Sequence, residues 1–435
     1  MWFAFATDSY RVSWYTGATM VPRVFLKTNE EREITQGFPW VYDNEVSSVK
    51  FDADDGSGVR QTSLPDCAVS DGSLVEVFAK GGAFLGTGVI NRASKIVVRL
   101  IGGEYANQID VDRADFFLRK IQAAYDVRKV FYNIHDSYRL VYGEADFIPG
   151  LIVERYCDVH KHIYLVVQFL ARSCEVFRNE ILAALRKVIK PYGVYERDDV
   201  AVREKEGLAQ KACWLGEVRD EVITICENGV LLAVDIAHGQ KTGHFLDQQA
   251  NRARLAQFCK GKRVLDTFAH TGAFGLNAVA GGARSVLSVD SSEEAVAAVR
   301  RNIALNHAER QMAVVCADVF DLLRQYERAG EQFDVIVLDP PAFAKNAKNL
   351  EKAYGGYKEI NLRAMRLLRP NGVLVTCSCS SYFHADQFYG MVMRAAADSH
   401  RRVQVLEKRG AGHDHPVLLG YPASDYLKCA ICRVV

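Results

Sequence analysis

The chain has almost no net charge and no apolar run of membrane-spanning length. Its 54 lysine and arginine residues are balanced by 53 aspartate and glutamate residues. A global field that draws the protein onto nucleic acid is therefore excluded, and any RNA binding must come from local patches. Because no apolar run approaches the roughly eighteen residues needed to cross a bilayer, no membrane partner is expected.

The eleven cysteines lack the spacing of a disulfide framework. Scattered cysteines are typical of a reducing compartment, so we expect a cytoplasmic protein. Cys429 and Cys432 form an isolated CxxC, but residues three apart on a strand point to opposite faces and do not suit one metal ion. His270, His413 and His415 also lack paired ligand spacing. No metal site is expected.

Residues 1–19 differ in character from the rest of the chain. They are aromatic but interrupted by Asp8 and Arg11, and no positively charged segment precedes them, which does not fit a signal peptide. Regular strand patterning begins after Met20. We expect residues 1–19 to be a loosely ordered extension or the product of a start site assigned too far upstream.

The length of 435 residues predicts two or three domains, and the patterning favours three. Residues 20–104 show short strand-like runs separated by glycine turns, which indicates a small β-barrel. Residues 105–235 combine strands with one amphipathic helix predicted over 176–189, as in an α+β domain. Residues 236–435 alternate strands with helices, which is typical of a doubly wound parallel sheet. The fold class is therefore multi-domain α/β.

Acidic and glycine residues at predicted strand ends indicate a nucleotide site. Asp266 ends one strand, and Gly272 lets the backbone approach a ligand at the following helix N-terminus. Asp290, twenty-four residues after Asp266, ends the next strand, where a carboxylate can accept hydrogen bonds from ribose hydroxyls. Ser291 and Glu294 are predicted to form a capping box for the next helix.

Two further strand ends favour S-adenosylmethionine over NAD. Gly272-x-x-Gly275 lacks the first glycine of GxGxxG, so it is a weak dinucleotide signal by itself, and NAD stays possible on these residues alone. Asp318 follows a third strand and is placed to bind the adenine amino group. Asp339 and two prolines end a fourth, and a proline pair stiffens the turn at a reaction centre.

A cysteine pair follows the apolar run 372–375, about forty residues after Asp339. A thiolate near such a turn can activate a pyrimidine, because addition at carbon 6 makes carbon 5 nucleophilic. A buried strand-end cysteine is more often inert, but the neighbouring Asp339 turn favours the functional interpretation. Cys377 and Cys379 share a strand face, so the local pattern does not choose between them.

Taken together, these residues resemble the bacterial large-subunit ribosomal RNA cytosine-5 methyltransferases that carry an N-terminal PUA domain. The similarity extends over nearly the whole chain from Met20. The specific stretches are Gly37 to Val41, Gly143 to Asp146, Gln240 to Gln248, Leu265 to Gly272, Asp339 to Phe343, Gly356 to Leu362, Ser378 to Ser380 and Asp414 to Pro416.

The resemblance implies a PUA domain over 20–104, a central α+β domain over 105–235 and a class I methyltransferase domain over 236–435. It places Cys379 in the nucleophile position. For the catalytic step we expect Asp339 to bond to the edge of the target base, and either Asp339 or water to take the carbon 5 proton. The resemblance also implies large-subunit ribosomal RNA as partner and allows a homodimer. The residues expected to bind S-adenosylmethionine are Phe245, Asp266, Phe268, Gly272, Asp290, Ser291, Asp318 and Asp339.

Three alternatives remain open at this point. A methyltransferase acting on adenine N6 or guanine N7 needs no thiol, although Ala342 occupies the place where adenine-N6 enzymes favour an aromatic residue. A non-catalytic RNA-binding assembly factor would use the barrel and the central domain only. An NAD oxidoreductase would use the same strand ends for another cofactor.

Overall fold

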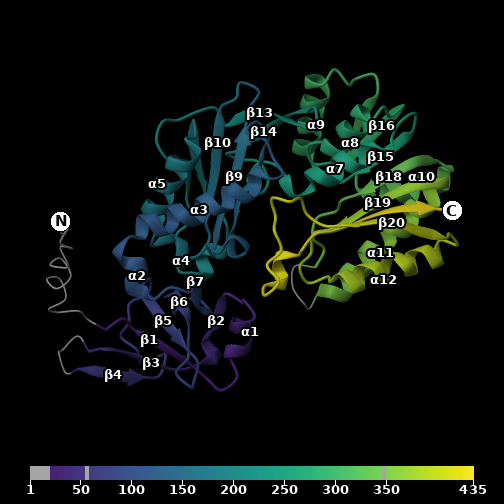
Figure 1. The fold of residues 1–435 in the computed structure, drawn as a ribbon. Coiled ribbons are helices and arrows are strands. Elements are labelled where there is room, and N and C mark those ends of the chain that lie inside the picture. The colour runs from purple at the N-terminus through teal and green to yellow at the C-terminus, as the bar shows by residue number, and fades with distance from the viewer. Residues whose placement is uncertain (1–19, 54–57, 345–348) are drawn as a thin grey trace, which may run out of the picture. The chain divides into compact units, whose positions relative to one another are not determined.

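The computed structural model describes residues 20–53, 58–344 and 349–435, and the expectation for residues 1–19 lies outside them (Figure 1). The chain divides into two compact units, one ending at Arg113 and one from Ala114 to Val435. Each unit has its own core and is described by itself.

The first unit is built on a seven-stranded sheet of order β2-β7-β6-β5-β1-β3-β4. The strand-like runs of the sequence at 24–26, 40–42, 74–78, 84–90 and 96–100 form strands β1, β2, β5, β6 and β7. The additional pair β3 and β4 was not predicted, because valine and phenylalanine alternate there with polar residues over only a few positions. The elements are β1 (Arg23–Leu26), α1 (Glu31–Thr35), β2 (Trp40–Tyr42), β3 (Val46–Asp52), β4 (Val59–Thr62), β5 (Leu74–Phe78), β6 (Phe84–Ile90), β7 (Ile96–Gly102) and α2 (Ala106–Val111).

The second unit begins with a five-stranded sheet of order β12-β11-β10-β9-β8 and a β13-β14 hairpin. The helix predicted over 176–189 begins later than expected, at Arg178. Val176 is 36% exposed, whereas Ile181 and Leu185 are fully buried. The elements are α3 (Arg113–Lys129), β8 (Tyr138–Tyr142), β9 (Leu151–Cys157), β10 (Ile163–Phe169), α4 (Arg172–Glu175), α5 (Arg178–Ile189), β11 (Gly193–Arg197), α6 (Val202–Lys205), β12 (Ala212–Trp214), β13 (Val222–Glu227) and β14 (Val230–Asp235).

The remainder of this unit is a doubly wound sheet of order β17-β16-β15-β18-β19-β21-β20. Strands β15 to β19 run parallel, while β21 is antiparallel to both β19 and β20. The elements are α7 (Gln249–Ala256), β15 (Arg263–Thr267), α8 (Ala273–Ala280), β16 (Ser285–Asp290), α9 (Glu293–Leu305), β17 (Met312–Cys316), α10 (Val319–Ala329), β18 (Phe333–Leu338), α11 (Leu350–Leu367), β19 (Leu368–Ser378), α12 (Ala385–Asp398), β20 (Val403–Arg409) and β21 (Lys428–Val434).

Alternating residues of the parallel strands face two separate cores. Val335 and Val337 of β18 belong to the cluster that includes α8 and α9, whereas Ile336 and Leu338 belong to the cluster with α10, α11 and α12. Helices therefore cover both faces, which explains why these strands read as continuous apolar runs. The chain order reverses between β15 and β18, and ligands bind at the carboxyl ends of strands at such a switch point.

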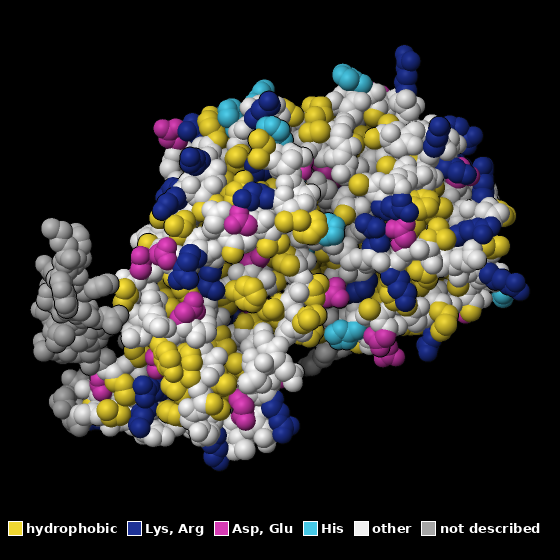
Figure 2. All heavy atoms as spheres, in the orientation of Figure 1, with side chains coloured by type: hydrophobic (Ala, Val, Ile, Leu, Met, Phe, Trp, Pro, Cys, Tyr) yellow, Lys and Arg dark blue, Asp and Glu magenta, His cyan; other side chains and the backbone are white. Residues whose placement is uncertain are grey.

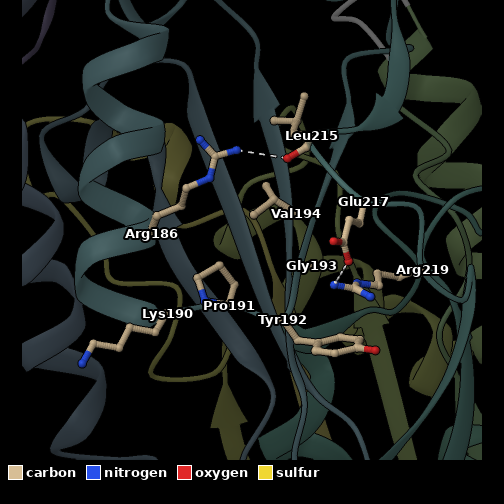
Figure 3. Close-up of a pocket in the computed structure, with 9 residues that line it drawn as sticks. All are labelled: Arg186, Lys190, Pro191, Tyr192, Gly193, Val194, Leu215, Glu217 and Arg219. Atoms are coloured by element: carbon tan, nitrogen blue, oxygen red, sulfur yellow. Dashed lines mark hydrogen bonds and ion pairs between the residues drawn. The ribbon is translucent and has the colours of Figure 1, made fainter.

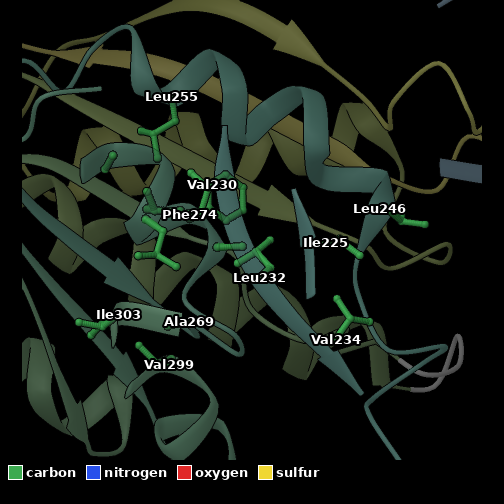
Figure 4. Packing of buried hydrophobic residues seen from close by; sticks show 14 of the residues in the cluster. Ile225, Val230, Leu232, Val234, Leu246, Leu255, Ala269, Phe274, Val299 and Ile303 are labelled. Carbon is green, nitrogen blue, oxygen red and sulfur yellow. The ribbon is translucent and has the colours of Figure 1, made fainter. Parts of the chain in front are cut away.

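One buried cluster joins the β13-β14 hairpin to the doubly wound sheet. Leu232 of β14 lies among the same buried side chains as Leu255 of α7 and Phe274 of α8 (Figure 4). Asn302 of α9 also accepts a hydrogen bond from the backbone N–H of Ala233 at 2.8 Å. Residues 114–235, called the central part below, thus share one core with the doubly wound sheet. The domain boundary expected at 235/236 stays a prediction.

The terminal CxxC lies on β21. Cys429 and Cys432 are both fully buried, and they belong to the two different clusters on either side of the sheet. The prediction that they face opposite ways is therefore confirmed. None of the helices in the described residues is long and apolar enough to cross a membrane.

Candidate active site

The carboxyl ends of β15, β16, β18 and β19 surround a cavity of about 270 Å³. Both carboxylates and aromatic rings contribute to its wall. Six of the predicted site residues line it: Phe245, Phe268, Asp290, Ser291, Asp339 and Cys379. The other three, Asp266, Gly272 and Asp318, are not among the lining residues.

The turn after β15 has an unusual backbone. Phe268, His270 and Gly272 all have positive φ, at 57°, 52° and 76°. Such φ values are strained for residues with a side chain, and strain of this kind gathers at ligand sites. Gly272 has a second constraint, since a Cβ there would lie 2.9 Å from Cγ1 of Val299. Gly272 therefore shapes the turn from behind the cavity.

Asp290 ties this turn to the next one. Its Oδ2 accepts a hydrogen bond from the backbone N–H of His270 at 2.9 Å, and its Oδ1 accepts one from Ser292 at 3.0 Å. The predicted capping box at Ser291 is wrong by one residue, because Ser292 is the N-cap and accepts from Ala295 N–H at 3.3 Å. Ser291 is instead exposed at the cavity edge.

Asp266 lies beneath the cavity wall and is only 1% exposed. One carboxylate oxygen accepts hydrogen bonds from Gly275 N–H at 3.0 Å and from the Ser288 hydroxyl at 2.8 Å. Burial raises the pKa of Asp266 to about 7. Asp318 is exposed and caps α10 by accepting from Asp321 N–H at 3.1 Å. Their roles in cofactor binding stay predictions.

Asp339 projects into the cavity from the end of β18. Its Oδ1 accepts a hydrogen bond from Nε2 of Gln248 at 2.9 Å. Burial, reinforced by the charge of Asp247, raises the pKa of Asp339 to about 6. Asp247 is itself held by Lys241 at 3.0 Å and by the Tyr426 hydroxyl.

The sequence alone indicates no individual role for Gln248, Asp247 or Lys241. The only signal was their position in the stretch from Gln240 to Gln248. That stretch precedes β18 by about ninety residues, and nothing local in it shows that it folds against Asp339.

The two neighbouring cysteines have different environments. Cys377 is fully buried, lies opposite Cys429 across β19 and β21, and belongs to the hydrophobic core. Strand β19 ends at Ser378, and Cys379 beyond it is half-buried and lines the cavity. Burial and the charge of Asp339 raise the pKa of Cys379 to about 11, while Lys241 acts in the opposite direction.

Buried charges from the central part anchor the loops around the cavity. Arg128 holds Asp146 through two hydrogen bonds of 2.6 and 2.7 Å and also donates to the carbonyl of Asp414 at 2.8 Å. Glu154 accepts from the Thr242 hydroxyl at 3.0 Å. The backbone N–H of Gly412 donates to the carbonyl of Asp247 at 2.9 Å. Residues 114–235 thus hold the loop over 240–248, which carries cavity residues, and the loop at 412–414, which is hydrogen-bonded to it.

A second cavity, of about 370 Å³, lies between the end of α5 and β11 (Figure 3). It contains none of the predicted site residues. Its arginines already have partners, since Arg186 donates to the carbonyl of Leu215 at 3.0 Å and Arg219 pairs with Glu217 at 2.5 Å. In residues 20–53, 58–344 and 349–435, no group of His, Cys, Asp and Glu side chains is arranged to hold a metal ion.

Comparison with known proteins agrees with this geometry. Residues 184–416 match the S-adenosylmethionine-dependent methyltransferase family, and residues 24–102 match the PUA-like domain. A candidate methyltransferase of known structure from Streptococcus mutans is 22% identical, with a TM-score of 0.75 over 95% of this chain and 100% of that one. Another, complexed with SAH, is 23% identical, with a TM-score of 0.76 and the same coverage.

The fold and the cavity define an S-adenosylmethionine-dependent methyltransferase with an N-terminal PUA-like domain. Ribosomal RNA large subunit methyltransferase I of Shewanella denitrificans is 41% identical over 95% of this chain and 100% of its own length. The enzyme of that name from Tolumonas auensis is 38% identical over 96% and 100%. The chain belongs to this ribosomal RNA large subunit methyltransferase I family.

Proposed function

We propose that the protein transfers a methyl group from S-adenosylmethionine to carbon 5 of a cytosine in large-subunit ribosomal RNA, through a covalent bond to Cys379. The observation that carries this proposal is that Cys379 lines the cofactor cavity together with Asp339, while Cys377 is enclosed in the core. The names of the relatives support ribosomal RNA as substrate. The scattered cysteines support the cytoplasm as its compartment.

The lining residues fit S-adenosylmethionine. Asp290 and Asp339 are carboxylates at a half-buried position, which suits a ligand with ribose hydroxyls and positive charge. Phe245 and Phe268 offer aromatic surface for an adenine ring. When bound, the cofactor supplies an electrophilic methyl group on a sulfonium. We therefore assign Phe245, Phe268, Asp290, Ser291 and Asp339 as direct contacts, and Asp266 and Gly272 as supports of the turn.

The residues of the chain account for the remaining chemistry. The target base leaves its stack so that both ring faces become accessible. The Cys379 thiolate then bonds to carbon 6, which makes carbon 5 nucleophilic, and carbon 5 accepts the methyl group as the methyl–sulfur bond breaks. A base removes the carbon 5 proton, the sulfur–carbon 6 bond breaks, and the thiolate is released.

Asp339 has two possible tasks in this sequence. Because its pKa is raised to about 6, both protonation states are accessible near neutral pH. The protonated carboxyl can donate to the ring nitrogen of cytosine, and the ionised carboxylate can accept the carbon 5 proton. Water is the other candidate for this last role.

RNA recognition must be local. On the face shown in Figure 2, lysine and arginine side chains are interspersed with acidic ones. This distribution agrees with the near-zero net charge and favours recognition of a particular RNA structure over nonspecific attraction.

The reaction is tested with large-subunit ribosomal RNA from cells that lack this protein. The RNA is incubated with the protein and S-adenosylmethionine and digested to nucleosides, which are identified by mass spectrometry. We expect 5-methylcytidine to increase. An increase in N6-methyladenosine or 7-methylguanosine instead would indicate attack by a nitrogen and contradict the covalent mechanism. Cofactor binding without methylation of any nucleoside would favour an assembly factor.

A further inference from the structure

Lys428 is a buried lysine directly behind the Cys379 turn. It is the first residue of β21 and lies opposite Ser378, the last residue of β19. Its residue exposure is 6%. The Nζ donates to the carbonyl of Ser380 at 2.6 Å and to the carbonyl of Tyr426 at 2.7 Å. The amino group is therefore fixed against the backbone that immediately follows Cys379.

Among the described residues, this amino group forms no ion pair with a carboxylate. Within the described part of the chain, its two hydrogen bonds go to backbone carbonyls, and no carboxylate lies within ion-pair distance of Nζ. Burying an ammonium without a nearby anion is unfavourable. Burial accordingly lowers the pKa of Lys428 to about 8, while the neighbouring Cys379 and, secondarily, Asp425 raise it.

Among the charged groups that the structure describes around Cys379, Lys241 is the cation that acts on its thiolate. Asp339 and Asp247 both disfavour a thiolate there. Lys241 favours it, but Lys241 is already paired with Asp247 at 3.0 Å. Tyr357, on α11, also senses the Cys379 charge, but its own pKa is raised by burial and it stays neutral. Within residues 20–53, 58–344 and 349–435, Lys428 is a further cation at this turn, and its Nζ is bonded to the Ser380 carbonyl.

We propose that Lys428 is a positioning residue that fixes the Cys379 turn through the Ser380 carbonyl and stabilises the Cys379 thiolate with its positive charge. This inference rests on the proposed function, because it gives a reason for a thiolate at Cys379. A thiolate in turn supplies the anion that the buried ammonium lacks. The pair accounts for a buried charged residue in β21, whose other charged residue, Arg433, is exposed.

The test is the rate at which iodoacetamide alkylates Cys379 in the full-length protein without RNA, with the modified residue located by mass spectrometry. Only the thiolate reacts, so at a fixed pH below the thiol pKa the rate follows the thiolate fraction. We expect Lys428→Met to lower the rate at Cys379 about tenfold, as for a pKa rise of about one unit. Lys428→Arg, which keeps the charge, should retain most of the rate.

The exposed Cys226 serves as an internal standard whose rate should not change. Lys408→Met removes an exposed lysine from the neighbouring strand β20 and is the matched control for lost charge. Lys428 does not line the cofactor cavity, so unchanged S-adenosylmethionine affinity by calorimetry shows that a variant is folded. If Lys428→Met does not fold, the alkylation rate of Cys379 in Lys428→Arg is compared with that in wild type at pH 9. At this pH the wild-type lysine has lost most of its charge and the arginine has not. Cys379 should therefore react faster in the arginine variant.

Two results would overturn the inference. Equal Cys379 rates in folded Lys428→Met and wild type would show that the charge has no effect. Equal losses in the methionine and arginine variants would show that only packing matters. Both readings are independent of methylation, so a Cys379→Ala variant that stays active would refute the covalent mechanism without deciding the Lys428 result.

Discussion

Replacing Asp266 by asparagine should lower the free energy of unfolding at acid pH and raise it at alkaline pH. The pKa of Asp266 is raised by burial from 3.8 to about 7. A carboxyl whose pKa is raised in the folded state is penalised as it ionises, so stability is lost as pH rises from the unfolded to the folded pKa. At about 1.36 kcal/mol per unit, roughly three units correspond to about 4 kcal/mol above pH 7.

Asparagine removes this penalty and keeps the two hydrogen bonds from Gly275 and Ser288, because its carbonyl oxygen can accept both. Its NH₂ group would occupy the position of Oδ1, which has no partner in the protein. An unsatisfied buried group of this kind costs about 1–3 kcal/mol at every pH. Asp266→Asn should therefore be less stable than wild type near pH 4 and more stable by about 1–3 kcal/mol at pH 8.

Urea unfolding of both proteins at pH 5 and pH 8 measures the difference in the free energy of unfolding. The difference should change by about 3 kcal/mol between these two values of pH, in favour of the variant. Asp318→Asn is the matched control, since it replaces an exposed capping aspartate by another good capping residue. A difference for Asp266→Asn that is the same at both pH values would refute the reasoning.

Two further predictions concern the surroundings of the cavity. Gln248→Leu removes the hydrogen bond that lowers the pKa of Asp339. With Asp339 as the base that takes the carbon 5 proton, the acidic limb of the pH–rate profile should move upward by as much as about one unit, whereas Gln249→Leu should leave it in place. An unmoved limb in Gln248→Leu would contradict this role of Asp339. Arg128→Met leaves the Asp146 carboxylate buried without its partner and should lower the free energy of unfolding, measured in urea, by about 3–5 kcal/mol. The double variant with Asp146→Leu should recover part of this loss. No recovery would argue against an unpaired charge as the cause.

The parallel sheet could be predicted because its strands are buried on both faces. Val335 to Leu338 is a continuous apolar run, and such runs alternating with amphipathic helices leave few other folds. By contrast, Val46–Asp52 has too many polar positions to be recognised as a strand. The depth of Asp266 was also not apparent, because a residue at a strand end can face the ligand or lie beneath it.

The strand periodicity of the sequence could not distinguish Cys377 from Cys379. Two residues apart on a strand share a face, but β19 ends at Ser378 and the chain turns. Cys377 therefore lies in the strand and faces the core, whereas Cys379 lies in the following turn and faces the cavity. The contact between Gln248 and Asp339 could likewise not be predicted from the sequence, because it joins residues 91 positions apart.

The covalent step is tested most directly with large-subunit ribosomal RNA that contains 5-fluorocytidine. Fluorine replaces the carbon 5 proton that the base removes, and it cannot leave in its place. The sulfur–carbon 6 bond formed during methylation should therefore not break, and the protein–RNA complex should persist on a denaturing gel. With S-adenosylmethionine present, wild type and Cys377→Ala should give the protein–RNA complex and Cys379→Ala should give none. A complex with Cys379→Ala at the wild-type level, or its loss only in Cys377→Ala, would contradict the assignment of Cys379 as the nucleophile.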